Sequence, residues 1–148
     1  MKQIIFIFSV LFALTSCDSD DSQTKEVSFS TILQDDSFYG NYDNPKANLV
    51  IRNQEDWTAL LSTMNPYTDT NYFVPDAIID FTKYQVIAVF DEVRNNGGYS
   101  IDITKITQTN SRIFVKVEQL KKGGDNTVMT QPYHIVKIAK SDKEVVFQ

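Results

Sequence analysis

The chain has 148 residues, a formal net charge of −5 at pH 7, one cysteine and one histidine. This length fits one ordinary domain with a single core, and the acidic balance disfavours nucleic-acid binding, which needs a basic face. One histidine and one cysteine cannot supply the usual ligands of a zinc site, so we expect neither a metal nor a cofactor.

The N-terminus carries the three parts of a secretory signal peptide. Lys2 gives a positive start, residues 4–14 are apolar, and small polar residues precede the single cysteine, Cys17. The sequence Leu-Thr-Ser-Cys at residues 14–17 resembles the lipobox read by the bacterial lipoprotein signal peptidase. The resemblance implies that residues 1–16 are a lipoprotein signal peptide and that Cys17 becomes acylated.

Two other interpretations of this segment are weaker. A transmembrane helix needs roughly 20 apolar residues, about twice the length of residues 4–14. A disulfide at Cys17 would have to join two chains, because the sequence holds no second cysteine. Acylation with more than one chain gives stable membrane attachment, so we expect a lipid anchor.

Residues 17–26 are predicted to be a flexible acidic tether, because too few apolar side chains are present to offset the entropy of ordering. The tether is either a plain solvated spacer or an export signal. An acidic run behind an acylated cysteine resembles the signal that sends some lipoproteins to the outer leaflet. We expect the protein at the outer membrane or cell surface of a Gram-negative bacterium, attached to the membrane through Cys17.

Residues 27–148 are predicted to form one domain. Alternating apolar residues predict a strand at 27–33, and a short apolar run predicts another at 48–52. Asn53 has the position of a helix N-cap, with acidic residues in the first turn. The apolar stripe of this helix consists of Trp57, Leu60, Leu61 and Met64.

The second half of the chain has the pattern of strands. Residues 86–90 are continuously apolar, as expected for a central strand covered on both faces. Alternating strands with one wet face follow at 99–104, where Asp102 faces water, and at 113–118. Turns at 110–111 and 123–126 predict three consecutive antiparallel strands. Residues 130–139 and 144–147 add the last two strands.

The predicted fold class is α+β, a mainly antiparallel sheet with one packed helix. His134 shares a strand face with Val136 and Ile138, which is typical of a partly buried structural histidine. Acid–base chemistry needs two carboxylates at a defined separation, and the pair Asp91 and Glu92 is more simply surface charge. No nucleophile elbow, phosphate-binding glycine loop or HExxH motif occurs, so we predict that the protein is not an enzyme.

The most distinctive segment joins two predicted strands. It consists of Arg94, Asn95, Asn96, Gly97, Gly98 and Tyr99. Asparagine and glycine accept positive φ, so the segment is either a tight turn or a loop in which glycine lets a partner's backbone approach.

Three stretches together resemble the C-terminal domain of the PrcB-like family, whose members are components of protease complexes. They are the apolar strand at 86–90, Gly-Gly-Tyr-Ser-Ile at 97–101 and Thr-Gln-Pro-Tyr-His-Ile-Val-Lys at 130–137. The resemblance runs from about Trp57 to Phe147. It implies a lipoprotein that accompanies a surface protease and stabilises its complex, with no catalytic residues to carry over.

The predicted function is therefore that of a non-enzymatic, membrane-anchored interaction protein. Its expected partner is a surface or periplasmic protease or another envelope protein, contacted through residues 94–99 with support from Tyr133 and His134. The alternative is a glycan- or peptide-binding module that uses exposed aromatics such as Tyr67, Tyr72 and Phe73.

Overall fold

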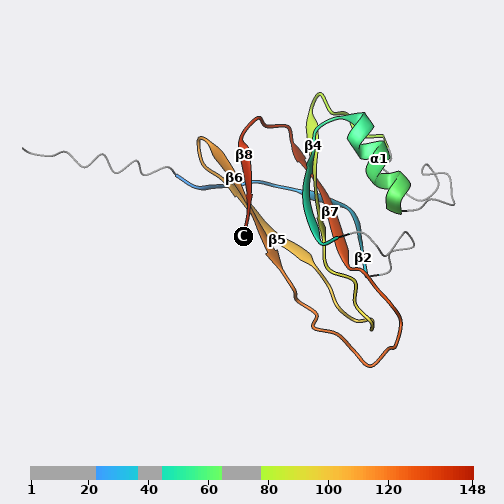
Figure 1. Ribbon diagram of the computed structural model, residues 1–148. Helices are drawn as coiled ribbons and strands as arrows, with labels where there is room; N and C mark the ends of the chain where they lie inside the picture. The colour runs from blue at the N-terminus through green and yellow to red at the C-terminus, as the bar shows by residue number, and fades with distance from the viewer. Residues whose placement is uncertain (1–22, 37–44, 65–77) are drawn as a thin grey trace, which may run out of the picture.

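The computed structural model describes residues 23–36, 45–64 and 78–148. These residues form two four-stranded sheets and one helix (Figure 1). In chain order the elements are β1 (Lys25–Glu26), β2 (Ser30–Asp35), β3 (Ala47–Ile51), α1 (Gln54–Met64), β4 (Tyr84–Phe90), β5 (Asp102–Gln108), β6 (Arg112–Glu118), β7 (Tyr133–Ala139) and β8 (Glu144–Phe147). The prediction of a mainly antiparallel β protein with one helix is confirmed in outline, with two sheets in place of one.

The described part has three layers. Sheet A has the strand order β1-β5-β6-β8, and sheet B has the order β2-β7-β4-β3. Sheet B lies in the middle, with sheet A on one face and α1 on the other (Figure 1). Every neighbouring pair is antiparallel except β6 and β8, which run parallel.

β4 is the central strand, as its continuous apolar sequence predicts. Val86, Ala88 and Phe90 belong to the core under α1, whereas Ile87 and Val89 belong to the core between the two sheets. Successive side chains of a strand point to opposite faces, so a strand between two cores needs an apolar residue at every position.

The helix is also formed as predicted. The side-chain oxygen of Asn53 accepts a hydrogen bond from the N–H of Asp56 at 2.8 Å, and its Nδ2 donates to the Asp56 carboxylate at 2.7 Å. This reciprocal pair closely resembles a capping box. Trp57, Leu61 and Met64 are buried against sheet B.

The predicted strand at 27–33 is wrong in its extent. The chain forms β1 in sheet A, crosses between the sheets, and then forms β2 in sheet B. Val27 and Phe29 lie on the crossing segment and pack into the core between the sheets. The apolar residues do alternate over 27–33, but they belong to a segment that passes from sheet A to sheet B and not to one strand.

The prediction of three consecutive antiparallel strands is also wrong. The turn at 110–111 does join β5 and β6 as an antiparallel hairpin, but β4 pairs with β3 and β7, and β6 pairs with β8. The residues at 123–126 therefore lie in a long loop and make no hairpin between β6 and β7.

Asp102 does not face water as predicted. It is 9 % exposed and accepts hydrogen bonds from the side chain of Gln34 at 2.7 Å and the N–H of Leu120 at 3.1 Å. The register of β5 shifts between Ile103 and Lys105, so the simple alternation seen in the sequence breaks at this point.

Cys17, residues 17–22 of the tether and the aromatic residues Tyr67, Tyr72 and Phe73 lie outside the described residues. Within the described ranges, α1 has neither the length nor the apolarity needed to cross a membrane.

Candidate functional site

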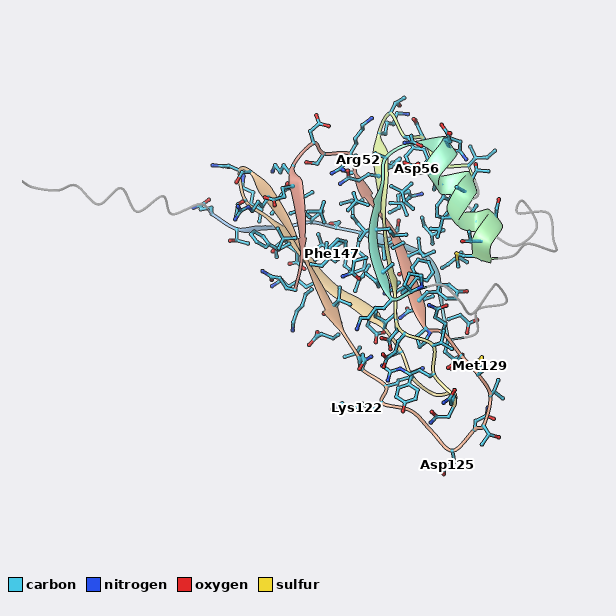
Figure 2. All side chains as sticks on the ribbon, viewed as in Figure 1. Arg52, Asp56, Lys122, Asp125, Met129 and Phe147 are labelled. Atoms are coloured by element: carbon cyan, nitrogen blue, oxygen red, sulfur yellow. The ribbon has the colours of Figure 1, made fainter. Side chains whose placement is uncertain are left out.

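Two long loops pair with each other below the sheets. Residues 91–101 connect β4 to β5, and residues 119–132 connect β6 to β7. We call these two loops together the arm, which forms the bottom of the molecule in Figure 1. Figure 2 labels Lys122, Asp125 and Met129 along its second loop.

The two loops are joined by backbone hydrogen bonds in antiparallel order. Arg94 and Thr130 exchange two bonds, at 2.7 and 2.9 Å, and the N–H of Gly97 donates to the carbonyl of Asn126 at 2.8 Å. Closer to β5, the N–H of Gly123 donates to the carbonyl of Gly98 at 3.1 Å. The arm is therefore an irregular ribbon of the chain's own backbone.

Glycine is required where the loops come closest. Gly98 has a φ of +81°, and a Cβ at this position would lie 2.9 Å from the backbone nitrogen of Gly124. Gly123 has a φ of +99°, and a Cβ there would lie 2.5 Å from the ring of Tyr99. The φ of Gly98 fits the predicted turn, and the backbone that comes close to Gly98 belongs to the same chain. The approach of a partner's backbone stays a prediction.

Arg94 supports the arm from its base. Its guanidinium lies 2.8 Å from a carboxylate oxygen of Asp91, 2.8 Å from Glu92, and 4.6 Å from the centre of the Tyr99 ring. This position combines two ion pairs with a cation–π contact. Arg94 thus uses its functional group within the molecule, and its side chain is 22 % exposed.

Asp91 is the junction at which the arm meets sheet B. Its side chain is fully buried and receives hydrogen bonds from Arg94 and from Gln119, the latter at 2.7 Å. The Nζ of Lys46 lies 3.5 Å from its other oxygen. Its backbone carbonyl accepts from the side chain of Gln131 at 3.0 Å. One residue therefore connects the start of β3 with both loops of the arm.

The carboxylates Asp91 and Glu92 both pair with Arg94 but differ in burial. Burial acts to raise the pKa of Asp91, but the hydrogen bonds and charge of Arg94 outweigh it, so the pKa lies below its ordinary value. Glu92 is 61 % exposed and ion-paired with Arg94. The role of Asp91 in joining the arm to sheet B was not predicted, although a charged residue directly after a wholly apolar strand could have indicated it.

His134 is a buried structural residue, as the sequence predicts. Its Nδ1 accepts the backbone N–H of Ile103 at 2.9 Å, and its Nε2 lies 2.9 Å from the hydroxyl of Thr31. A backbone N–H can only donate, so the bond to Nδ1 requires the neutral ring with its proton on Nε2. Burial lowers the pKa of His134, and the charge of Asp102 acts in the opposite direction.

The predicted support of a surface contact by Tyr133 and His134 needs correction. Tyr133 is 3 % exposed and stacks on Phe90 with ring centroids 6.0 Å apart, and His134 is 4 % exposed. Neither side chain is available to a partner at the surface. Residues 94–99 do come together on the arm, but Gly97 is buried there and Arg94 is engaged internally.

The surface of the arm is formed mainly by its second loop. Residues 119–129 are all exposed, and they include the large apolar side chains of Leu120, Val128 and Met129. The described part of the chain exposes only two other large hydrophobic residues, Ile78 and Tyr84. The predicted partner contact lies on the first loop, at residues 94–99. The second loop was not predicted as a contact, because its sequence has no strong motif.

Beside the arm lies a polar pocket of about 510 Å³, lined by residues that include Asp36, Tyr99, Asp102 and Lys121. In the described ranges, no group of three or more His, Cys, Asp or Glu side chains is placed to hold a metal ion.

Comparison with known proteins gives one match. A family model described as PrcB C-terminal matches residues 85–139, a segment that contains almost all of β4, both loops of the arm, the β5–β6 hairpin and all of β7. No curated protein and no solved structure matches the chain. The match lies within the predicted resemblance from about Trp57 to Phe147, so the segment that carries the central strand and the whole arm is similar to the PrcB C-terminal domain.

Proposed function

We propose that the protein is a non-enzymatic component of a complex and binds a protease, or another protein of the cell envelope, through the second loop of its arm. The observation that carries this proposal is the family match over residues 85–139, which contains the whole arm. The family resemblance points to a protease complex, and the arm supplies a surface on which such a partner can dock.

The arm has the physical properties of a docking element. Leu120 is 65 % exposed and Val128 is 51 % exposed, so partner binding would remove both from water, which is favourable for apolar surface. The first loop, tied down by Arg94 and the paired glycines, holds the second loop in place. Such preorganisation reduces the entropy lost on binding.

The acidic groups of the described region support a role without catalysis. The side chains of Asp91, Glu118 and Glu144 each form ion pairs, with Arg94, Lys116 and Arg112 respectively. His134 is buried, and its two ring nitrogens are used between strands. These groups serve the fold, which leaves no arranged acid–base pair among them.

We further propose that an acylated Cys17 attaches the protein to the outer membrane, with a tether that is shorter than the predicted residues 17–26 because Lys25 and Glu26 form β1 of sheet A. The lipobox-like sequence and the polar segment after it support this arrangement. Replacement of Cys17 by serine would remove the acylation site. Metabolic labelling with a fatty-acid analogue would then show label on the natural chain and none on the Cys17→Ser chain, whereas equal labelling would contradict lipidation at this residue.

The docking proposal is tested by site-specific photo-crosslinking in the native envelope. A photoreactive amino acid replaces Val128 on the arm or, as a control, Tyr84, a large exposed residue at the opposite end of β4. We expect one envelope protein to be captured from position 128 and not from position 84. Capture of the same set of proteins from both positions would contradict docking through the arm.

A further inference from the structure

β8 has an edge that pairs with no strand in the described part of the chain. Its other edge is fixed by Gln148, whose N–H donates to the carbonyl of Val115 and whose carbonyl accepts the N–H of Val117, at 2.9 and 2.8 Å. Backbone groups of successive residues point to opposite sides of a strand. Val145 and Phe147 therefore turn their N–H and C=O groups away from β6, toward the open edge.

A groove runs along this edge, between β8 of sheet A and the edge strand β3 of sheet B. One part, of about 230 Å³, is lined by residues that include Val117 and Phe147. Another part, of about 590 Å³, is lined by residues that include Val50 and Val145. All four are partly buried members of the core between the sheets, so the groove exposes the side of that core.

The edge is protected by its shortness but by few other features. Natural edge strands are commonly shielded by charged residues, proline, bulges or short length, and the last three of the four residues of β8 are Val145, Val146 and Phe147. The charges nearby are already used, since Glu144 pairs with Arg112 at 2.8 Å and Lys143 donates to the side chain of Gln108 at 2.7 Å. The strand edge itself therefore offers backbone groups between apolar side chains, with charged residues such as Arg52 and Asp142 beside it.

We propose that β8 binds β8 of a second copy of this chain, antiparallel, about a two-fold axis beside Val146. In this register Val145 of each copy lies opposite Phe147 of the other, and both residues offer outward backbone groups. The two pairs together make about four hydrogen bonds. Glu144 lies opposite the neutral side chain of Gln148 of the second copy, and its own carboxylate is paired with Arg112 at 2.8 Å.

Neighbouring registers are less favourable. A shift of two residues in one direction places Phe147 opposite Lys143 of the second copy, and the opposite shift places Val146 opposite Gln148. Either shift loses an apolar cross-strand pair, and such pairs stabilise sheets. The self-complementary sequence therefore selects one arrangement, in which sheet A continues across both copies. This inference does not rest on the arm or on the identity of its partner.

The first test uses a disulfide between copies. Val146→Cys is placed in the full chain together with Cys17→Ser, purified in detergent, so that position 146 carries the only thiol. The two-fold register puts the two Cα atoms of position 146 about 4.5 Å apart, within the range that a disulfide spans. Mild oxidation should give a covalent dimer.

Lys116→Cys in the same Cys17→Ser chain is the matched control. Lys116 is exposed on β6, one strand further from the proposed axis. Its copies would be three strand spacings apart, roughly 14 Å, and displaced by a further distance of about 13 Å along the strands, because Lys116 lies two residues past the axis. They should not join. Failure of position 146 to cross-link, or equal cross-linking at both positions, would overturn the proposal.

A second test avoids thiols. Val146→Lys, in the Cys17→Ser chain, puts two ammonium groups opposite each other across the axis and should raise the dimer dissociation constant by at least about tenfold, since directly opposed like charges are unfavourable. Val146→Thr keeps a β-branched residue and should leave the dimer intact. Sedimentation should show a reversible dimer for the parent chain. A monomer at every concentration, or a dimer unchanged by Val146→Lys, would contradict the assignment.

Discussion

β4 and the arm lie next to each other in the chain but are held together in different ways. β4 has apolar side chains on both faces, five of which are at most 4 % exposed, and regular ladders with β3 and β7. The arm begins at the next residue and has no such core among its described residues. It relies on a buried carboxylate, one arginine and two glycines with positive φ.

The difference shows that neighbouring parts of one segment can be stabilised in two ways, by apolar burial in β4 and by specific polar contacts in the arm. Burial in β4 is non-directional and depends on apolar area, so a similar side chain can replace another. The contacts of the arm depend on position and charge, so a single wrong atom disturbs them. A stable strand thus carries a loop pair that is free to present a surface to a partner.

The largest effect is expected in β4. Ile87 is fully buried between the sheets, and Ile87→Ala should lower the free energy of unfolding by about 2–5 kcal/mol through lost burial and a cavity. Val128→Ala on the arm surface is the control, and it should stay within about 0.5 kcal/mol of the natural chain. Chemical denaturation measures both. Similar losses of unfolding free energy for the two variants would contradict the view that β4 lies in the core and Val128 on the surface.

Arg94→Met should come next, with a loss of about 2–3 kcal/mol, because it removes the closer of the two cations that pair with the buried carboxylate of Asp91. The double variant Asp91→Asn/Arg94→Met removes the charge as well, and its neutral amide oxygen can still accept from Gln119. We expect it to be more stable than the single variant. A double variant less stable than Arg94→Met would contradict the role of the ion pair.

Gly98→Ala should cost about 1–3 kcal/mol, because alanine at a φ of +81° is strained and its Cβ would press on the backbone of Gly124. Gly124→Ala is the matched control, since it has an ordinary φ and its added Cβ would come no closer than 3.8 Å to another atom. Hydrogen exchange of the amides of Gly97 and Gly123 should accelerate in the first variant only. Unchanged exchange would show that close approach at Gly98 is not needed.

The smallest of these stability effects concerns pH. Burial lowers the pKa of His134 in the folded protein, so the unfolded chain binds this proton more readily. The stabilisation that comes from keeping the His134 ring neutral is fully present above the unfolded pKa of about 6.5. It is lost as the pH falls from there through the folded pKa. His134→Asn, which retains a side-chain oxygen for the N–H of Ile103, should remove this slope. Denaturation midpoints measured across this window check the prediction, and an unchanged slope would refute it.

Local features of the fold could be predicted from the sequence. The cap at Asn53, the helix stripe and the continuous apolar strand β4 each depend on residues close together in the chain, and each was confirmed. The structural role of His134 followed from its strand neighbours. The match at residues 85–139 confirmed the predicted resemblance to the PrcB C-terminal domain over that segment.

Strand partners could not be predicted in the same way. Nothing in the alternation of residues 27–33 marks the point at which the chain passes from sheet A to sheet B. β8 pairs in parallel with β6, although β7, which lies between them in the chain, belongs to sheet B. Only the first loop of the arm could be predicted from the sequence. Its glycines mark a turn or a close approach, whereas the second loop, which approaches Gly98, contains no comparable motif. Contacts between distant segments determine these features.

The most direct test of the central claim is quantitative capture of envelope proteins by two matched double variants of the full chain, produced in the native envelope. Leu120→Ser/Val128→Ser removes apolar surface from the arm, and Ile78→Ser/Tyr84→Ser removes exposed apolar surface elsewhere. If the arm docks the partner, the first variant should lose most of the captured protein while unfolding at the same denaturant concentration as the natural chain, and the second should capture normally. Equal capture by both variants would contradict a docking role for the arm.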